Sequence, residues 1–455
     1  MDKNSRRDFI KKAGITGLGF ALAPSLAFAG KKDGIVKLAF IGVGARGMNH
    51  LNNALQRDDV EITAICDISP KAIDNALKKF EKYGKKAPEV YGKNEKDYKN
   101  MLERKDVQGV IISTPWVWHT PMAVDTMKAG KYAGVEVSAA MTLEECWDLV
   151  NTHEETGSHC MILENVCYRR DVMAVLQMVR EGLFGEMMHA RCGYQHDLRH
   201  VKFNNGEQIY GGGVEFGEKA ASEAKWRTHH SLHKNGDLYP THGLGPVALY
   251  MDINRGNRFT SISSFATKSR GLNNYIIEKG GKDHPNAHLD WKLGDIVTST
   301  ITTANGETII VTHDTNLPRP YSLGFRVQGT NGLWQHEDGY MGGNLMHIQG
   351  HTKDHHWDNA DEWLNKYDHP LWQKYGEHAT GAGHGGMDFF VMHEFVHAIR
   401  TQAAPPLDAY DAAAWSAVTP LSEMSIQEGG EPQSFPDFTR GKWFKRKPVF
   451  GFSQV

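Results

Sequence analysis

Along the first third of the chain, the apolar residues occur alternately in short continuous runs and in segments with helical spacing. The runs with the length and apolar content of buried strands are 35–44, 60–67, 107–114, 131–137 and 159–165. The segments with helical spacing between them are 45–56, 69–83, 119–130 and 142–157. Strands that alternate with helices pair as a parallel sheet covered on both faces. We therefore predict an α/β domain with a doubly wound parallel Rossmann sheet over residues 34–166.

The pattern changes after about Tyr168, which predicts a second domain over residues 167–455. One more helix is expected at 171–182. The β-rich segments that follow, with turn residues between them, are 186–197, 258–269, 295–305 and 307–316. They predict an α+β domain with an open, mostly antiparallel sheet. Residues 336–384 have weak periodicity and predict a long surface excursion, and helices expected at 386–401 and 411–427 would pack back.

The first thirty residues differ from the rest. Arg6 and Arg7 give a basic start, a Gly/Ala/Leu-rich run follows, and Ala27-Phe28-Ala29 has a small-x-small cleavage pattern. This order is typical of a twin-arginine signal peptide, here residues 1–29. The alternative is an N-terminal amphipathic helix or membrane anchor, but the run is short for a span. We expect export to the periplasm or secretion, and no stable membrane span after signal removal.

Composition narrows the class of partner. The net charge of −3 over 455 residues gives no electrostatic reason to expect nucleic acid or anionic lipid. The five cysteines are odd in number, contain no C-x-x-C pair, and lie mostly in apolar segments. Buried free thiols are therefore expected rather than a disulfide framework.

A glycine-rich loop follows the first predicted strand and opens the first helix. It contains Gly42-x-Gly44-x-x-Gly47. In this context Gly42 permits a tight turn, Gly44 lets the backbone approach a diphosphate, and Gly47 allows close helix–strand packing. Asp67 ends the second strand, where a carboxylate binds ribose hydroxyls and repels a 2′-phosphate. The loop predicts a dinucleotide cofactor, NAD rather than NADP.

Ligands of such a sheet bind beyond the carboxyl ends of its strands. We expect polar and aromatic residues at those ends to line the nicotinamide half of the site, although each could serve packing instead. The predicted cofactor-binding residues there, together with the loop arginine, are Arg46, Trp116, His119, Glu136, Val137 and Asn165.

A late segment contains the H-E-x-x-H pattern of zinc metalloproteases at His393-Glu394-x-x-His397. The extended form of that pattern needs glycine and histidine where this chain has Arg400 and Ala403. An apolar helical stripe runs through the same segment. We therefore predict a packing helix and no metal site.

Several of these motifs together resemble the Gfo/Idh/MocA oxidoreductases. They are the glycine loop, Asp67, residues 113–145 and residues 393–417. That superfamily usually has Glu-Lys-Pro after the fifth strand, and its lysine assists proton transfer. Here the segment is Glu136-Val137-Ser138, so the lysine is absent, and of the superfamily's Asp-x-x-x-His only His242 remains.

These departures, with Trp116-x-x-His119, the segment Tyr239–Gly243 and the leader, resemble glycoside hydrolase family 109. The resemblance implies hydrolysis of terminal α-N-acetylgalactosamine from glycoconjugates. The implied route is oxidation at C3 with NAD⁺, elimination, addition of water and reduction, with no net redox. Two alternatives stay open: a periplasmic NAD(P)-dependent sugar oxidoreductase of the same superfamily, and a non-catalytic sugar-binding protein with vestigial NAD.

The route needs proton transfer, for which Tyr239 and His242, expected in one short loop of sequence YPTHG, are the candidates. Histidine suits proton transfer near neutral pH, and tyrosine does if a nearby cation or the cofactor lowers its pKa. Which residue serves which carbon is left open, and Tyr239 is also expected at the cofactor. The resemblance carries substrate contacts to Tyr194, Arg227, Tyr239, His242 and Tyr321. It also makes a homodimer through paired open sheets an expectation.

Overall fold

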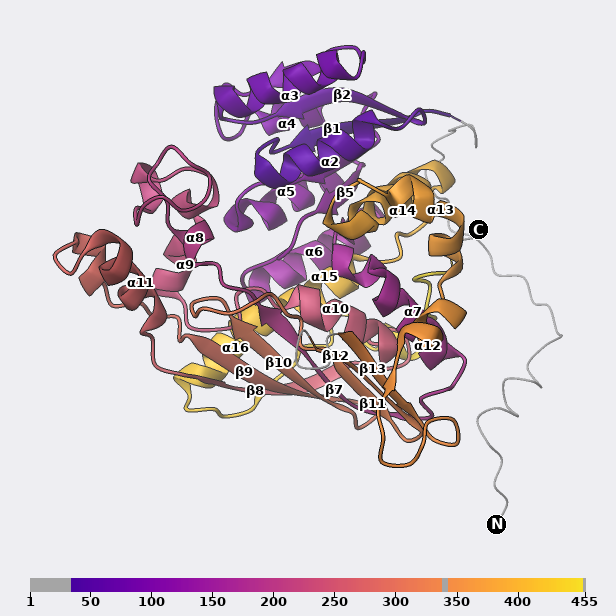
Figure 1. Cartoon of the computed structure of the whole chain (residues 1–455). Coiled ribbons are helices and arrows are strands. Elements are labelled where there is room, and N and C mark those ends of the chain that lie inside the picture. Colours follow the sequence, from indigo (N-terminus) through magenta and orange to yellow (C-terminus); the bar gives the residue numbers. More distant parts are fainter. Residues whose placement is uncertain (1–33, 338–342, 453–455) are drawn as a thin grey trace. The chain divides into compact units, whose positions relative to one another are not determined.

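Six parallel strands form the sheet predicted for the first third of the chain, in the computed structural model that describes residues 34–337 and 343–452 (Figure 1). The strands are β1 Val36–Ile41, β2 Val60–Cys66, β3 Glu89–Tyr91, β4 Gly109–Ile112, β5 Tyr132–Val135 and β6 Cys160–Ile162. Their order is β3-β2-β1-β4-β5-β6. The order reverses between β1 and β4, so the doubly wound prediction is confirmed, and ligands are expected at this switch point.

The helices of this half are α2 Ala45–Leu55, α3 Pro70–Lys82, α4 Tyr98–Leu102, α5 Trp116–Lys128 and α6 Leu143–Thr156. Local sequence fixes their ends. Ser69 caps α3 by accepting a hydrogen bond from the Ala72 amide, with Pro70 at the first position. The pattern did not predict β3 or α4. Strand β3 gave no signal because it is three residues long and has no buried position.

Nine strands form the second sheet, β14-β13-β12-β11-β7-β10-β9-β8-β15. They are β7 Met187–Gln195, β8 Phe259–Ala266, β9 Ile296–Thr303, β10 Thr308–Asp314, β11 Arg326–Gly329, β12 Gly332–Glu337, β13 Gly343–Ile348, β14 Asp358–Asn359 and β15 Gln433–Ser434. Only β7 and β10 pair in parallel. The predicted mostly antiparallel sheet is therefore confirmed.

The helices of the second half are α7 Arg170–Arg180, α8 Arg199–Lys202, α9 Arg227–His233, α10 Thr241–Tyr250, α11 Gly271–Gly280, α12 Asp361–Lys366, α13 Pro370–Ala379, α14 Met387–Thr401, α15 Ala409–Ser416 and α16 Val418–Gln427. The short 3₁₀ helices are η1 Asn165–Tyr168, η2 Gly217–Lys219, η3 Ser222–Lys225, η4 Pro285–His288, η5 His384–Gly386 and η6 Lys442–Phe444. The single helix predicted at 411–427 is wrong. Two helices, α15 and α16, meet at Ala417.

The prediction of a plain surface excursion for residues 336–384 is also wrong. This segment supplies β13, β14, α12 and α13. Leu371 and Trp372 are buried, and the Trp372 indole N–H donates to the Tyr168 carbonyl at 2.8 Å. Its hydrophobic residues are too widely spaced to produce a periodic signal, although they pack against the rest of the chain.

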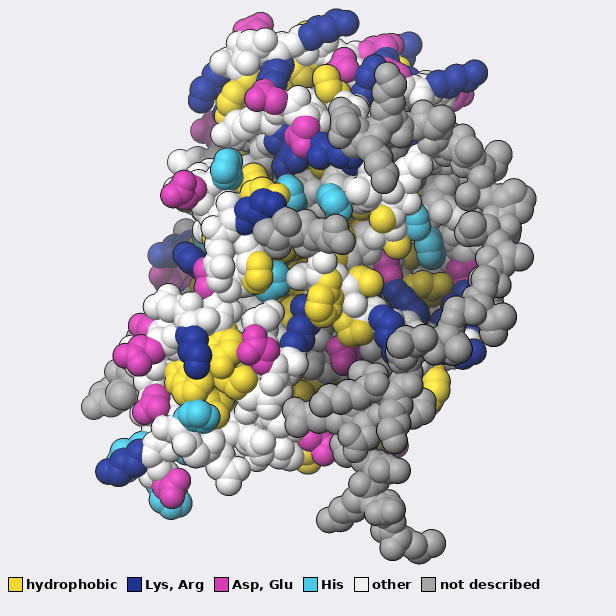
Figure 2. All heavy atoms as spheres, turned by 90° about the vertical axis from the view of Figure 1, so that its right-hand side faces the viewer, with side chains coloured by type: hydrophobic (Ala, Val, Ile, Leu, Met, Phe, Trp, Pro, Cys, Tyr) yellow, Lys and Arg dark blue, Asp and Glu magenta, His cyan; other side chains and the backbone are white. Residues whose placement is uncertain are grey.

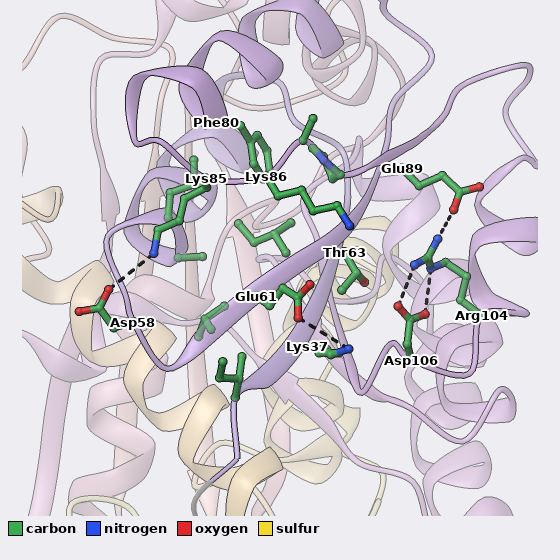
Figure 3. A pocket seen from close by; sticks show the side chains of 17 residues that line it. Lys37, Asp58, Glu61, Thr63, Phe80, Lys85, Lys86, Glu89, Arg104 and Asp106 are labelled. Carbon is green, nitrogen blue, oxygen red and sulfur yellow. Dashed lines mark hydrogen bonds and ion pairs between the residues drawn. The ribbon is translucent and has the colours of Figure 1, made fainter.

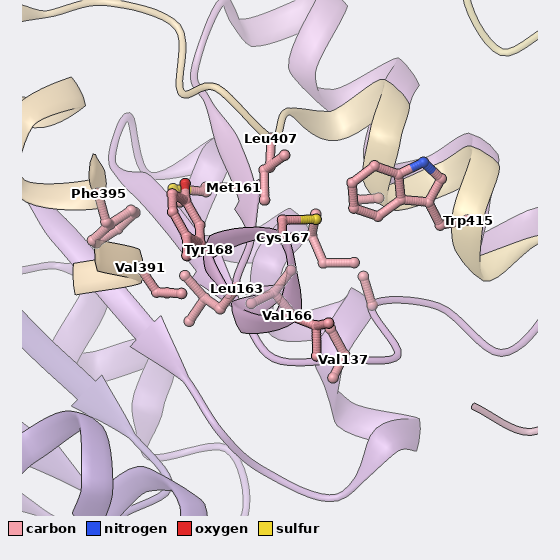
Figure 4. Close-up of a cluster of buried hydrophobic side chains, with 14 of the residues drawn as sticks. Val137, Met161, Leu163, Val166, Cys167, Tyr168, Val391, Phe395, Leu407 and Trp415 are labelled. Carbon is pink, nitrogen blue, oxygen red and sulfur yellow. The ribbon is translucent and has the colours of Figure 1, made fainter. Parts of the chain in front are cut away.

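Helix α14 packs against the parallel sheet, although residues 163–386 separate it from the end of β6. Figure 4 shows Val391 and Phe395 in one buried cluster with Leu163 and Tyr168. A Cβ atom on Gly134 of β5 would lie 3.1 Å from the Phe395 ring, so a glycine leaves room for the aromatic side chain. Residues from Ile35 onward form one compact unit, and the predicted boundary at residue 166 stays a prediction.

Part of the second half stands to one side of its sheet. Helices α8, α9 and α11 lie at the left of Figure 1. They share a small hydrophobic cluster of their own around Phe203, Leu272 and Trp291. We call residues 199–235 and 267–293 the side lobe.

All five cysteines are buried and free, as expected. Across residues 34–337 and 343–452, no helix combines the length and the apolarity needed to cross a bilayer. The predicted signal peptide, residues 1–29, lies outside the described residues.

Candidate functional site

The three glycines of the loop after β1 have different surroundings. Gly42 has φ +84°, and a Cβ there would collide with the Ser113 carbonyl. A Cβ on Gly47 would collide with the Gly42 carbonyl, whereas a Cβ on Gly44 would meet nothing within 4 Å. Gly44 is also the N-cap residue of α2, and it has no side chain that could accept a hydrogen bond from the first amides of the helix. The loop therefore leaves open backbone at the positive end of a helix, which fits a dinucleotide diphosphate.

Asp67 lies beside this loop. Its carboxylate accepts a hydrogen bond from the Val43 amide at 2.8 Å and another from the Ser69 amide at 2.8 Å. Each carboxylate oxygen has a further lone pair, so Asp67 can still accept hydrogen bonds from ribose hydroxyls. The residues present thus fit NAD.

Three predicted cofactor-binding residues meet in one ionic network. The Arg46 guanidinium donates to Glu136 at 2.7 Å and to both oxygens of Asp388 at 2.8 and 3.0 Å. The Asn165 amide donates to Asp388 at 2.8 Å, and His50 Nε2 lies 2.6 Å from Glu136. The network joins the glycine-loop helix α2, the carboxyl ends of β5 and β6, and the first turn of α14.

The oppositely charged groups of this network stabilise one another. Burial raises the pKa of Glu136, but Arg46 and His50 outweigh it and bring the pKa to about 2. The pKa of Asp388 is also held well below its usual range, where burial is outweighed by His384 and Arg46. Glu136 is therefore an anion bound to Arg46, and it does not replace the absent lysine as a proton carrier.

His119 and Val137 lie beneath the ends of β4 and β5. The His119 ring nitrogens face two backbone carbonyls, Ser138 at 2.8 Å and Thr114 at 2.7 Å. Burial lowers the pKa of His119. Val137 is also buried. His119 therefore lies between the two strand ends, and as a neutral ring it donates a hydrogen bond to one of these two carbonyls.

The predicted catalytic and substrate residues converge on one cluster of rings. The ring centroids of Tyr239 lie 4.6 Å from Tyr194 and 4.8 Å from His242. The Arg227 guanidinium carbon lies 5.1 Å from the Tyr239 centroid and 5.0 Å from that of Trp116. These five residues come from β7, α5, α9, α10 and the segment before α10. Tyr321 lies at the edge, 6.2 Å from Tyr194.

His242 is held by a carboxylate that the sequence reasoning missed. His242 Nδ1 lies 2.8 and 2.9 Å from the two oxygens of Glu164, which is fully buried after β6. A carboxylate fixes the tautomer with the proton on Nδ1, so Nε2 is free to accept a proton. The predicted loop for YPTHG is partly wrong, because Thr241 and His242 form the first turn of α10.

Tyr239 does not have the lowered pKa that its use as a base requires. Burial and the neighbouring Tyr194 raise its pKa well above 10, and the opposing effect of Arg227 is smaller. Tyr239 is therefore a phenol at neutral pH and acts as a hydrogen-bond donor. Its backbone amide donates to Asp237 at 3.0 Å, and the Asp237 amide in turn donates to Ser422 at 2.8 Å, which fixes this segment on α16.

Comparison with known proteins identifies the family. Residues 168–445 match "Glycosyl hydrolase 109, C-terminal domain", and residues 36–163 match "Oxidoreductase family, NAD-binding Rossmann fold". A "Glycosyl hydrolase family 109 protein" of Parabacteroides distasonis is 54% identical over 98% of this chain and 99% of that protein. The chain belongs to glycosyl hydrolase family 109. An "Alpha-N-acetylgalactosaminidase" of Tannerella forsythia is also 54% identical, over 98% of this chain and 99% of its own length.

Solved structures share the fold of this family 109 protein at low identity. A levoglucosan dehydrogenase in complex with NADH and L-sorbose has a TM-score of 0.64 and 17% identity, covering 88% of this chain and 99% of that one. An aldose-aldose oxidoreductase from Caulobacter crescentus has a TM-score of 0.59 and 14% identity, covering 88% and 99%. These structures share the fold, and the matched NAD-binding Rossmann family supports NAD as the cofactor.

Two residues of the family 109 site were missed, for different reasons. Glu164 stands directly before Asn165 at the end of an apolar strand, so the same polar-at-strand-end signal would have found it. Asp388 follows the glycine-rich stretch 381–386 at the start of an apolar helix. Nothing local connects it to Arg46, because their contact depends on how α14 packs.

The H-E-x-x-H segment lies on α14. The His393 and His397 rings stack 6.5 Å apart, and His393 also lies 4.7 Å from the Tyr375 ring. Glu394 is buried, away from the two histidines on the half-exposed side. Within residues 34–337 and 343–452, no group of three His, Cys, Asp or Glu side chains is placed to hold a metal. Figure 2 shows histidine side chains at several separate places on the face that it presents.

One cavity lies elsewhere, against β2 (Figure 3). It has a volume of about 660 Å³, and no predicted site residue lines it. Charged groups along it pair with one another, as Lys37 does with Glu61 and Lys85 with Asp58, each at 3.6 Å. We therefore place the family 109 site at the ring cluster and not in this cavity.

Proposed function

We propose that this protein is an α-N-acetylgalactosaminidase that removes terminal α-N-acetylgalactosamine from glycoconjugates without net redox. The relative named for that activity supports the substrate, since it is 54% identical to this chain over nearly its full length. The structural observation that carries the proposal is the His242–Glu164 pair beside Tyr239. It provides a proton acceptor and a proton donor in one cluster of rings.

NAD would be held by the Gly42–Gly47 loop and Asp67, and when bound it would supply the hydride-transfer chemistry at C3 of the sugar. The chain's own residues handle protons and position the sugar. His242 Nε2 accepts a proton from the sugar, and Glu164 stabilises the imidazolium that forms. The Tyr239 hydroxyl donates to a sugar oxygen, and the Arg227 guanidinium donates hydrogen bonds to sugar hydroxyls or the N-acetyl oxygen. Tyr239 is therefore a donor beside the sugar, and His242 is the proton acceptor of the ring cluster.

The carboxylates near the cluster are engaged in other contacts. Ordinary glycosidases flank the scissile bond with two carboxyl groups. Here Glu164 binds His242, Glu223 forms an ion pair with Arg227, and Asp237 accepts from a backbone amide. This arrangement supports elimination through oxidation at C3 over direct displacement.

The test is hydrolysis in D₂O of p-nitrophenyl α-N-acetylgalactosaminide by the purified protein, without added NAD. We expect p-nitrophenol release and deuterium at C2 of the product, measured by NMR, because elimination removes the C2 proton. A direct hydrolase would leave hydrogen at C2. Net NADH formation from a free sugar without glycoside cleavage would contradict the proposal and indicate an oxidoreductase, and binding without turnover would indicate a sugar-binding protein.

We also propose that residues 1–29 direct twin-arginine export and that the enzyme works in the periplasm or outside the cell. The paired Arg6-Arg7 and the Ala27-Phe28-Ala29 site support this. Replacing both arginines by lysine should retain the protein in the cytoplasm in a fractionation experiment. We further propose that two copies of the chain pair through the open face of the second sheet. Light scattering would test this homodimer by measuring the molar mass in solution.

A further inference from the structure

A line of rings leads from the proposed catalytic residues toward the surface. The Tyr194 hydroxyl lies 3.0 Å from His196 Nδ1, and the His196 ring meets Tyr321 edge-on at 5.0 Å. Tyr321 is 42% exposed, whereas Tyr194 is buried. Burial, helped by Arg227 and His200, lowers the pKa of His196 to about 4, so its ring is neutral at neutral pH. The line therefore presents neutral, hydrogen-bonding rings.

A separate pair of rings lies in the side lobe, four residues along the chain from His196. After α8 the chain folds back, and the Gly211 amide donates to the His200 carbonyl at 2.7 Å. This places the Tyr210 ring against the His200 ring, with a centroid distance of 5.9 Å. Tyr210 is 43% exposed and its neighbour Ile209 is 54% exposed. An aromatic and an aliphatic side chain thus face solvent at the tip of this turn.

The loop that carries Tyr210 has a defined conformation. Asn204 is fully buried, and its side chain donates to the Ala221 carbonyl at 2.8 Å. The same side chain accepts from the amides of Gly206 and Ala221, each at 2.9 Å. Gly206 and Gly212 adopt positive φ, which only glycine does readily. Tyr210 is therefore exposed on an anchored turn.

The turn that carries Tyr210 is tied to the segment that holds the Glu223–Arg227 ion pair. The Asn204 side-chain amide donates to the carbonyl of Ile209 at 3.5 Å and to that of Ala221 at 2.8 Å. Glu223 follows Ala221 by two residues and forms the ion pair with Arg227. Arg227 in turn stacks on Trp116 and Tyr239 in the ring cluster. The Glu223–Arg227 pair therefore links the segment beside the exposed ring to the sugar-binding cluster.

We propose that Tyr210 and His200 form a subsite for the sugar residue to which the terminal N-acetylgalactosamine is bonded. This inference rests on the proposed function. Tyrosine presents an apolar face for the C–H face of a pyranose and a hydroxyl for its oxygens. The two arginines nearest the turn along the chain are already paired, Arg227 with Glu223 and Arg199 with Asp197. A neutral saccharide therefore suits the subsite better than an anionic ligand.

The test compares kcat/KM of the Tyr210→Ala holoenzyme on two substrates. One is an α-N-acetylgalactosamine-capped neutral oligosaccharide, and the other is methyl α-N-acetylgalactosaminide, which has nothing to place in the subsite. We expect a loss of roughly 3- to 10-fold on the oligosaccharide and no change on the methyl glycoside. Tyr210→Phe should retain most of the oligosaccharide activity. The matched control is Ile277→Ala, which removes a side chain of similar exposure (41%) elsewhere in the lobe.

The outcomes separate this inference from the proposed function. Suppose that the wild-type holoenzyme cleaves the methyl glycoside. If Tyr210→Ala then loses the same kcat/KM on both substrates, or loses none on either, the subsite is wrong while the proposed function stands. A loss confined to an α-N-acetylgalactosaminyl-serine peptide, tested in parallel, would also overturn it, because the occupant would then be peptide. If the wild-type holoenzyme cleaves neither glycoside, the proposed function itself is wrong.

Discussion

At the scale of single residues, the pairing of His242 with Glu164 makes a sharp prediction. Glu164→Gln keeps the shape of the side chain but removes the charge that stabilises an imidazolium and fixes its tautomer. We expect kcat on the p-nitrophenyl glycoside to fall by roughly 10²- to 10⁴-fold, with deuterium exchange at C2 slowed in parallel. The melting temperature should be measured alongside. Wild-type kcat in a folded variant would show that the pair has no role in proton transfer.

Asp237 predicts how stability depends on pH. Burial raises its pKa to about 7, whereas an unfolded chain releases the same proton near pH 3.9. Between these values the unfolded state binds fewer protons, so stability falls as pH rises and then levels off above pH 7. Asp237→Asn still accepts from the Tyr239 amide but does not titrate. Relative to wild type, the variant should gain stability, on the order of a few kcal/mol, as pH rises from 4 to 8.

Urea denaturation at pH 4, 6 and 8 checks this difference. A stability gap between variant and wild type that stays constant with pH would contradict the buried, protonated state of Asp237.

The residues that were predicted and those that were missed show what the sequence alone can supply at this scale. The three loop glycines and Asp67 occupy the positions their spacing implied, because those roles are local. The contacts of Asp388 could not be foreseen, because they depend on packing between distant segments.

At the scale of elements, α14 is a packing helix whose interior face can be tested. Phe395 contacts the parallel sheet where Gly109 and Gly134 leave room. Phe395→Ala should cost about 3–5 kcal/mol of unfolding free energy by calorimetry or denaturation. His397→Ala, on the half-exposed side of the same helix, is the control and should change stability by less than about 0.5 kcal/mol. Similar losses for both variants would contradict the assigned orientation.

The same helix carries the metalloprotease-like pattern, which predicts the response to metal removal. The His393 and His397 rings stack with each other and with aromatic neighbours, and Glu394 is buried. Dialysis against EDTA should therefore leave kcat unchanged, with metal content followed by mass spectrometry. Activity that is lost on chelation and restored by zinc would contradict the packing role.

Most elements of the first half could be predicted because the apolar residues of each strand and each long helix have the spacing typical of that kind of element. The elements that were missed along the whole chain are short or irregular. Strand β3 has three residues, and α12 and α13, in the second half, lie in a stretch whose apolar side chains follow no repeat. The split between α15 and α16 was missed for a different reason, since apolar spacing continues through Ala417, where the two helices meet.

At the scale of the whole molecule, the Arg46–Asp388 contact joins the cofactor loop to a helix from the end of the chain. Removal of NAD should therefore lower the stability of the entire unit rather than of the first half alone. We expect a single calorimetric transition in both forms, with the holo form more stable by about 2.7 kcal/mol at a hundredfold excess of NAD over its Kd. Two separate transitions would show that the halves unfold independently.

The position of α14 also constrains the order of events during synthesis. The ribosome makes the six parallel strands first, but the helix that covers part of their sheet is residues Met387–Thr401. Until that helix emerges, an apolar face containing Gly109 and Gly134 has no cover, and incomplete chains with such faces aggregate or bind chaperones. The finished NAD site therefore appears only after residues Met387–Thr401 have been made, so cofactor loading follows synthesis of that helix.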